Sequence, residues 1–357
     1  MLKRMLGIFL TCAMLCVGAC AEEWTVVHEG NGNLHLYYRI AVDGAQPKSI
    51  PEALNTADEG AALNVRFEGA LYDFDCTQGR NYLASPADFD LAALLGFFWP
   101  ESEAASVLDA AETVPLSDGS TVTRFANAGA EIALVTEAGR VRYARDGLDW
   151  AGADAFSGGA LDPYEFAGLP TADAQYASPE QALRDAQALL DCVAVGASPL
   201  SVDAFGATEY LDAQSRSVEI YSFALCCDDI PMFHHAQQHP TSETMLPAQE
   251  IKLIYDVDGL AGLSLTAFHF EPVDETAQPF DLEAAAARLR AGEGAFLFDK
   301  NPEVSLIELQ YLPVQAQDGG YLCTPAWCMS TYNSALSSSW FADEVIAAYS
   351  AFDGVPL

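Results

Sequence analysis

One short stretch of this sequence gathers residue types that could do chemistry. It contains two cysteines, two aspartates and three histidines: Cys226, Cys227, Asp228, Asp229, His234, His235 and His239. His235 and His239 are four residues apart, so on a helix they would share a face and could bind zinc. However, the Asp-Asp-Ile-Pro sequence from residue 228 is typical of a hairpin turn, and Pro240 would end any helix directly after His239. We therefore predict a strand pair followed by a polar loop without a metal, with His235 and His239 as the only candidate ligands.

Other patterns that could mark an active site are weak or missing. Asp256 and Asp258 precede Gly259 as in the start of a calcium loop, but the later acidic ligands of an EF-hand are missing, so a turn is expected. The sequence contains no G-x-S-x-G, H-E-x-x-H, P-loop or G-x-G-x-x-G motif. Trp99 and Trp327 could stack on a sugar, yet both lie in apolar runs that predict core positions. Tyr311 is likewise predicted to be a core residue, in the same hairpin as Trp327. We predict no catalytic residue and no cofactor.

The charge of the chain limits its partners. The sequence has 51 acidic and 16 basic residues, for a formal net charge of −35. Nucleic acid binding needs basic side chains that displace counterions, and an anionic membrane surface attracts basic segments, so both partners are disfavoured. The acidic residues are scattered along the chain, which predicts a solvated surface.

The first residues have the order of a secretory leader. Lys3 and Arg4 precede an uncharged, largely apolar stretch that ends in small residues at Ala21. Two cleavage sites remain open. The Ala-Cys-Ala sequence at 19–21 fits a signal peptide of residues 1–21, whereas the Val-Gly-Ala-Cys sequence at 17–20 resembles a lipobox, with a leader ending at residue 19 and Cys20 acylated. Both predict a protein outside the cytoplasm, secreted or attached to the outer face of the cell membrane, whose only membrane contact would be a lipid on Cys20.

Six cysteines follow the predicted leader, in a compartment where disulfides form: Cys76, Cys192, Cys226, Cys227, Cys323 and Cys328. The sequence cannot choose among their pairings. Cys323 and Cys328 are the nearest local candidates. On a strand, Cys226 and Cys227 should point to opposite faces.

Three apolar or amphipathic segments predict helices, and each is followed by strand-like sequence. The first covers 89–99, the second starts with a capping box at Ser178 and Gln181, and the third covers 281–291. The strand pairs expected after them are 131–135 with 140–145, 218–225 with a short run after residue 229, 251–255 with 262–270, and 304–311 with 321–332.

This order predicts an α+β fold of repeated units, each a helix followed by an antiparallel hairpin, with the helices packed on curved antiparallel sheets. The segment 158–177 is rich in Gly, Pro, Ala and Asp, which is typical of a linker. We therefore expect an N-terminal α+β domain at 22–157 and a C-terminal α+β domain at 178–357.

Residues 176–332 resemble two exported families. Ser178-Pro179-Glu180-Gln181-Ala182 resembles the helix start of PepSY-like modules. The sequences Ile307-x-Leu309-x-Tyr311 and Tyr321-Leu322-x-x-Pro325-x-Trp327 are similar to the closing strands of YycI-like proteins and related exported families of unknown function. A weaker similarity covers Ile40-x-Val42-Asp43 and Ile50-Pro51. These motifs are apolar, so they indicate fold more than function.

The resemblance implies a non-catalytic accessory or regulatory module outside the cytoplasm that binds another protein. YycI-like relatives restrain a membrane sensor kinase, and PepSY modules accompany exported peptidases, so these are the implied partners. The regulatory relatives keep an N-terminal membrane helix, whereas a cleavable leader is predicted here. A secreted hydrolase or a glycan-binding protein is the alternative, because the many acidic residues leave paired carboxylates open.

Overall fold

The computed structural model describes most of the chain after residue 47 and two short strands before it. The described residues are 25–29, 36–39, 48–55, 61–116, 120–127, 129–135, 139–145, 176–193, 200–211, 217–233, 250–294, 301–315, 320–332 and 343–357.

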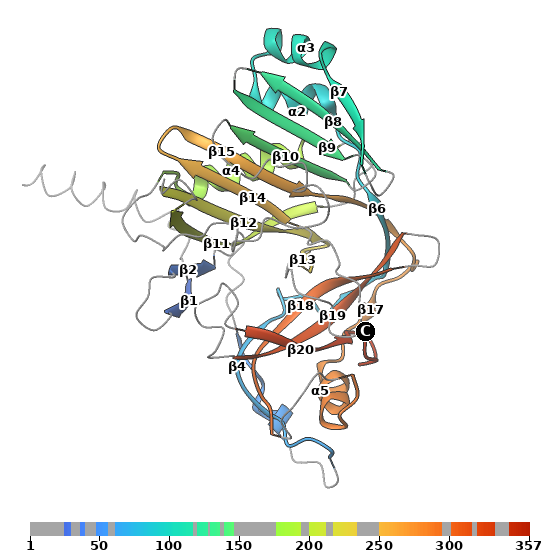
Figure 1. Cartoon of the computed structure of the whole chain (residues 1–357). Coiled ribbons are helices and arrows are strands. Elements are labelled where there is room, and N and C mark those ends of the chain that lie inside the picture. The colour runs from blue at the N-terminus through green and yellow to red at the C-terminus, as the bar shows by residue number, and fades with distance from the viewer. Residues whose placement is uncertain are drawn as a thin grey trace, which may run out of the picture.

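Two large sheets dominate the molecule (Figure 1). The first sheet has nine strands in the order β11-β12-β14-β15-β10-β9-β8-β7, with β13 paired to β12, and all its pairs are antiparallel. Its strands are β7 (Glu112–Pro115), β8 (Thr121–Asn127), β9 (Ala130–Val135), β10 (Arg140–Arg145), β11 (Leu200–Leu211), β12 (Ser217–Cys227), β13 (Ile230–Pro231), β14 (Glu250–Asp256) and β15 (Gly259–Thr266).

The second sheet has seven strands in the order β16-β6-β19-β18-β4-β3, with β20 paired to β19. Its strands are β3 (Lys48–Ser49), β4 (Arg66–Tyr72), β6 (Tyr82–Pro86), β16 (Phe268–Pro272), β18 (Glu303–Gln315), β19 (Tyr321–Tyr332) and β20 (Asp343–Ser350). The pair β18–β4 is parallel and the others are antiparallel. Two small ribbons pair β1 (Thr25–Glu29) with β2 (Leu36–Arg39), and β5 (Gln78–Gly79) with β17 (Gln278–Pro279).

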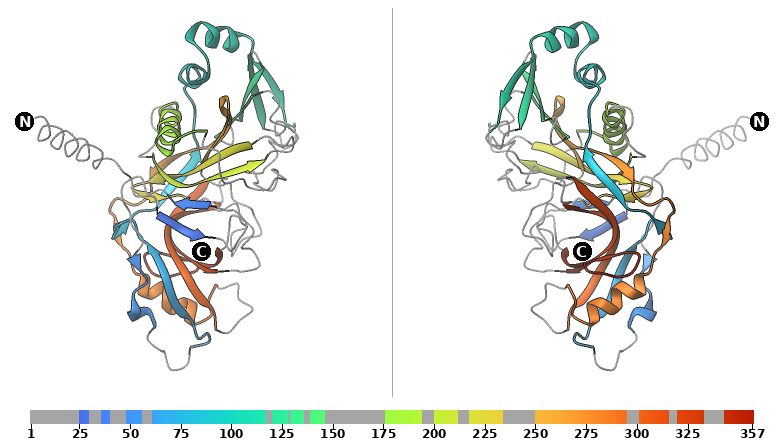
Figure 2. Two further views of the ribbon diagram at one scale, coloured as in Figure 1. Left: turned by 90° about the vertical axis from the view of Figure 1, so that its left-hand side faces the viewer. Right: turned by 90° about the vertical axis from the view of Figure 1, so that its right-hand side faces the viewer.

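Helices lie beside each of the two large sheets, so the fold class is α+β as predicted. Helices α2 (Leu91–Phe98), α3 (Glu101–Asp109) and α4 (Pro179–Leu190) accompany the first sheet, and α5 (Leu282–Arg290) lies beside the second (Figure 2). A short 3-10 helix, η1, covers Glu52–Asn55. In the described part of the chain, no helix has the length and apolar character needed to cross a membrane.

Local capping residues start three of the helices where the sequence predicts them. The Asp90 carboxylate accepts hydrogen bonds from the N–H groups of the first turn of α2, and Asp281 accepts one from Ala284 at 2.9 Å. The Ser178 hydroxyl accepts from the Gln181 N–H at 3.2 Å, which satisfies an otherwise unpaired helix donor. In place of the return bond of a capping box, the Gln181 side-chain oxygen accepts from Arg184 at 2.8 Å, and its amide nitrogen donates to Asp185 at 2.7 Å.

The four predicted hairpins are present. They are β9–β10, β12–β13, β14–β15 and β18–β19. The turn between β12 and β13 places Asp228 and Asp229 at φ values of 49° and 62°, the left-handed region in which aspartate is more tolerated than most residues. One difference concerns the predicted strand 262–270: β15 ends at Thr266, and the chain leaves the first sheet and continues as β16 in the second.

Strand pairing crosses the predicted linker at 158–177 in both sheets. In the first sheet β10 pairs with β15, and in the second β6 pairs with β16 and β19 while β4 pairs with β18. Each sheet is therefore built from both halves of the chain. Most of the segment 158–177 lies outside the described residues.

The two sheets share one hydrophobic core. A single cluster of buried side chains includes Phe125 and Leu253 from the first sheet and Tyr82 and Ile307 from the second. Where the chain passes between the sheets, the Ala87 N–H donates to the Ala267 carbonyl at 3.0 Å, and the Ala267 N–H donates to the Gly139 carbonyl at 2.9 Å. These contacts make the passage between the sheets a packed, hydrogen-bonded junction.

Candidate functional site

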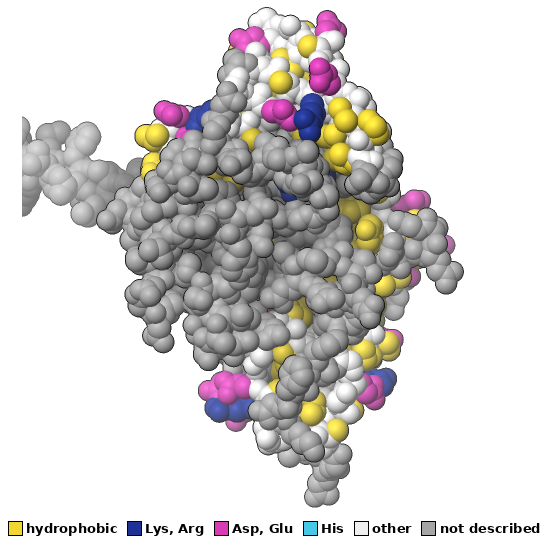
Figure 3. Space-filling view, in the orientation of Figure 1, with side chains coloured by type: hydrophobic (Ala, Val, Ile, Leu, Met, Phe, Trp, Pro, Cys, Tyr) yellow, Lys and Arg dark blue, Asp and Glu magenta, His cyan; other side chains and the backbone are white. Residues whose placement is uncertain are grey.

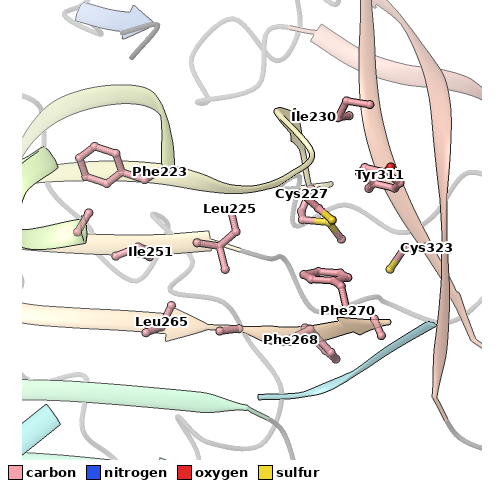
Figure 4. Close-up of a cluster of buried hydrophobic side chains, with 14 of the residues drawn as sticks. Phe223, Leu225, Cys227, Ile230, Ile251, Leu265, Phe268, Phe270, Tyr311 and Cys323 are labelled. Atoms are coloured by element: carbon pink, nitrogen blue, oxygen red, sulfur yellow. The ribbon is translucent and has the colours of Figure 1, made fainter. Parts of the chain in front are cut away.

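The hairpin of β12 and β13 connects the two sheets. Strand β12 belongs to the first sheet, and the residues directly after β13 pair with β18 of the second. Met232 forms a parallel bridge with Tyr311, and the Phe233 N–H donates to the Tyr311 carbonyl at 2.8 Å. The Cys-Cys-Asp-Asp sequence at 226–229 therefore lies at the junction between the two sheets (Figure 4).

Five residues meet at this hairpin and are called the junction cluster here: Tyr82, Cys227, Asp228, Tyr311 and Cys323. The Tyr82 hydroxyl donates a hydrogen bond to the Asp228 carboxylate. The Tyr82 ring packs edge-on against Tyr311, with the ring centroids 5.6 Å apart. Cys323 is the register partner of Tyr82 on β19. Apart from Asp228, all members are buried.

Burial keeps the thiols and phenols of the junction cluster protonated. It raises the pKa of Cys227 to about 12, helped by the Asp228 charge and opposed by the polar hydroxyl of Tyr82. It likewise raises the pKa of Tyr82, together with the hydrogen bond to Asp228, and the pKa of Tyr311. Burial and the nearby Cys227 raise the pKa of Cys323. Because the thiolate is the nucleophilic form of cysteine, these thiols are poorly suited to covalent catalysis in the folded state.

Cys76 lies half-buried near the same turn. Its thiol donates to the Phe74 carbonyl at 3.4 Å. Burial raises its pKa to about 11, and the charge of Asp229 adds to this effect. Nearby, the exposed Lys48 ammonium contacts Asp73 at 2.7 Å and Asp75 at 2.6 Å.

Of the residues considered as possible ligands or modification sites, the structure describes only Asp256 and Asp258. The candidate metal ligands His235 and His239, and the candidate lipidation site Cys20, lie outside the described residues. Within the described part of the chain, no group of three or more metal-ligating side chains is close enough to hold an ion. The turn at residues 256–259 is a hairpin turn, as predicted. The Asp256 carboxylate accepts from the Asp258 N–H at 2.8 Å and pairs with Arg145, so its charge is already matched.

The aromatic residues predicted to be core residues are buried. Tyr311 is 0 % exposed, Trp327 4 % and Trp99 8 %. Trp327 packs edge-on against Phe280 with ring centroids 6.2 Å apart. Neither tryptophan therefore presents a ring face to a sugar.

Cys323 and Cys328, the nearest local candidates for a disulfide, are not paired in the structure. The six described cysteines are free thiols, and Cys323 and Cys328 point to opposite faces of β19. Cys323 belongs to the large core, whereas Cys328 packs in a separate cluster with Phe233 and Leu312. The reason is the two-residue period of a strand, which sends positions an odd number apart to opposite sides.

Three exposed apolar side chains lie side by side on β6, β19 and β18. Leu83 pairs with Leu322, and Leu322 pairs with Val314, so these three side chains form a line across β6, β19 and β18 that is called the apolar row here. They are 37 %, 36 % and 37 % exposed, far more than their neighbours Tyr82 and Cys323 in the core. Figure 3 shows hydrophobic side chains reaching the surface on the side where β6 passes between the sheets.

Sequence reasoning missed the apolar row. The stretch Tyr82-Leu83-Ala84 is apolar at every position, so its pattern does not tell the inner face from the outer one. Continuous apolar sequence in two neighbouring strands is the signal that could have indicated an apolar outer face.

Comparison with known proteins gives no family for this chain. No family model and no curated protein matches it. Among solved structures, it is similar to an uncharacterized protein from Eubacterium rectale ATCC 33656, with a TM-score of 0.47 and 11% identity over 82% of this chain and 90% of that one. It is also similar to YycH from Bacillus subtilis, with a TM-score of 0.35 and 11% identity over 74% of this chain and 52% of YycH.

Proposed function

We propose that this protein is a non-catalytic accessory module outside the cytoplasm that binds another protein through the apolar row. The observation that carries the proposal is the alignment of Leu83, Leu322 and Val314 in one register line on the surface of the second sheet. Single exposed apolar side chains are ordinary, but an aligned set on adjacent strands offers a continuous surface to a partner. Covering such side chains stabilises a complex, because each Å² of apolar surface removed from water contributes roughly 25 cal/mol.

The charge around the apolar row indicates the chemistry of the partner. Glu271 is the register partner of Leu83 on β16, the terminal strand of the sheet in the described part of the chain, and Asp274 and Glu275 follow directly. The whole chain has a formal net charge of −35. A cationic partner would be attracted over long range and matched at the rim of the row. We therefore propose an extended segment with alternating apolar and basic side chains that lies across the apolar row on the face of the sheet, with its basic side chains toward Glu271.

The resemblance of residues 176–332 to YycI-like and PepSY-like proteins supports the same class of function. It suggests that the helix-plus-hairpin segments are related units, and that the partner is a membrane sensor kinase or an exported peptidase. The proposal also includes export, with a mature chain that starts at Glu22 or at an acylated Cys20. Mass spectrometry of the mature N-terminus would show which start is used, and a full-length product in the cytoplasm would contradict export.

Binding is tested first with a defined probe. A fluorescent peptide of about eight alternating Lys and Val residues should bind the purified mature chain, as measured by anisotropy. The double variant Leu83→Ser/Leu322→Ser should weaken binding about tenfold or more. The matched control is Leu108→Ser/Val257→Ser, which removes apolar side chains that are 40% and 80% exposed elsewhere. Equal binding by both double variants, or equal binding of an alternating Glu and Val peptide, would contradict the proposal.

The partner itself is tested in cells. A photo-crosslinking amino acid placed at Leu322 should capture one protein, and capture should be lost when Leu83 is changed to Ser. The same crosslinker at Leu108 should not capture that protein. Capture at both positions would show that the contact is not made by the apolar row.

A further inference from the structure

A histidine lies on the same outer face of the second sheet as the apolar row. Phe268 and Phe270 on β16 are 3% and 2% exposed, and Figure 4 shows both side chains within the buried cluster. Side chains alternate along a strand, so His269 and Glu271 point to the opposite, outer face. His269 is half-buried, whereas Glu271 is exposed and is the register partner of Leu83. His269 therefore belongs to the rim of the proposed binding surface.

Strand geometry places His269 close to the charged end of the apolar row. Residues two apart on a strand share a face and have Cα atoms about 6.4–6.8 Å apart. The register pairs of His269 with Ser85 and of Glu271 with Leu83 put both side chains directly beside β6. A charge on His269 therefore acts on Glu271, and on a basic side chain bound to it, over less than the Debye length of about 8 Å at physiological salt.

The other charges around this face are negative or lie on the core side. The charged residues on β6 and β16 and within three residues of their ends are, besides His269, Arg80, Asp88, Glu271, Asp274 and Glu275. Arg80 lies close to the hydroxyl of Tyr82, a core residue. Strands β19 and β18 contribute the uncharged Leu322 and Val314. Histidine is the residue type in this set whose charge ordinarily changes between about pH 5 and 8.

We infer that His269 is a pH-sensitive control of the apolar row, which releases a basic partner as the pH falls. A neutral imidazole leaves the Glu271 carboxylate to a lysine or arginine of the partner. An imidazolium adds a positive charge beside Glu271, which repels that side chain and competes for the carboxylate. The inference rests on the proposed function, because it concerns the same surface and the same partner.

Apolar neighbours of Glu271 strengthen this effect in the complex. Leu83 lies across from Glu271 on β6, and Val273, which is 56% exposed, follows two residues later. A partner that covers these side chains removes water around the carboxylate, and charges interact more strongly as the effective dielectric constant falls. Two unit charges about 7 Å apart in bulk water already change an affinity about threefold. At least this change is expected here.

Anisotropy measurements with the fluorescent Lys and Val peptide, with both ends blocked, test the inference on the purified mature chain. The Kd should rise about threefold or more between about pH 8 and pH 5.5, where histidine gains its charge and carboxylates keep theirs. The rise should be smaller in about 0.5 M NaCl, because salt screens the added charge.

Variants assign the pH dependence to one side chain. His269→Gln should bind equally well at both pH values, because glutamine does not titrate. His269→Arg carries a permanent charge and should bind weakly at both. The matched control His234→Gln/His235→Gln/His239→Gln changes three other histidines and should keep the pH dependence of the wild-type chain.

The possible failures are distinguishable. A pH dependence that survives in His269→Gln, or that disappears in the triple control, would overturn the inference. Binding of the wild-type chain that does not change with pH would overturn it as well, while leaving the proposed function in place. An absence of binding at pH 8 would overturn both.

Discussion

Asp228 shows how a single residue can serve both a turn and a contact between sheets. Its backbone lies in the left-handed region, which the two-residue turn requires, and its carboxylate accepts the Tyr82 hydroxyl from the other sheet. A left-handed conformation costs energy for a residue with a Cβ atom, and the hydrogen bond offsets part of that cost. Asp229 adopts the same conformation, so it provides a matched comparison.

A double-mutant cycle should detect this contact. Tyr82→Phe and Asp228→Gly together should show a coupling free energy of about 1 kcal/mol in urea unfolding, the usual net value of a hydrogen bond. Glycine keeps the left-handed turn while removing the carboxylate. The cycle of Tyr82→Phe with Asp229→Gly should show coupling near zero. Equal coupling in both cycles would mean that the effect comes from the turn backbone.

The thiol of Cys76 should ionise at a higher pH in the folded chain than in the unfolded chain. Its pKa is raised from 9.0 to about 11, because burial and nearby acids disfavour the thiolate. The neutral thiol therefore contributes stability that is fully present below pH 9 and is lost as the pH rises through 11. At pH 8, about one thiol in a thousand is ionised in the folded chain, against about one in ten when unfolded. Alkylation of Cys76 by iodoacetamide, followed by mass spectrometry, should inflect near pH 11 in the folded chain and near pH 9 in urea. An inflection near pH 9 in the folded chain would contradict the burial of this thiol.

Two glycines differ in the space around their Cα atoms, one in a strand and one in a helix. Gly69 on β4 has a φ of +151°, and a Cβ atom added there would lie 1.9 Å from the Ser305 carbonyl oxygen on β18. That contact is with backbone, so a neighbouring side chain cannot move to relieve it. Gly96 in α2 is exposed, and a Cβ atom added to it would have no neighbouring atom within 4 Å.

These two glycines should respond in opposite ways to the same change. Gly69→Ala should break the parallel β4–β18 pairing and lower the free energy of unfolding by more than about 3 kcal/mol, as large steric errors do. Gly96→Ala should raise it by about 0.5–1 kcal/mol, since alanine favours the helix. Urea denaturation of both variants checks this. A mild effect of Gly69→Ala would show that β4 and β18 can separate without cost.

At the scale of the whole molecule, net charge should oppose folding. A formal net charge of −35 creates self-repulsion in the compact state, and salt screens it, since the Debye length falls from about 30 Å at 0.01 M to about 3 Å at 1 M. The melting temperature should therefore rise by several degrees between about 10 mM and 500 mM NaCl, as measured by calorimetry. KCl should act equally. A larger rise with MgCl2 at matched ionic strength would instead reveal a specific cation site.

The sequence by itself determined the local elements of this protein. Ser178 and Asp281 mark helix starts, and the Asp-Asp and Asp-Val-Asp-Gly segments mark hairpin turns, because caps and turns depend on residues within a few positions of each other. Alternation along a strand also separated Cys226 from Cys227. The sequence further indicated that Tyr311 and Trp327 are core residues, since apolar runs bounded by turns predict buried strands.

Only the tertiary structure decided which strands are neighbours. Leu83 and Leu322 are far apart in the chain, and so are Met232 and Tyr311, yet each pair meets because β6 pairs with β19 and the residues after β13 pair with β18. A two-residue period specifies the face on which a side chain lies but not the strand beside it. That choice depends on which apolar faces can be buried together over the whole chain, and no local pattern contains this information. For this reason the junction cluster and the apolar row were visible in the folded chain and not in its sequence.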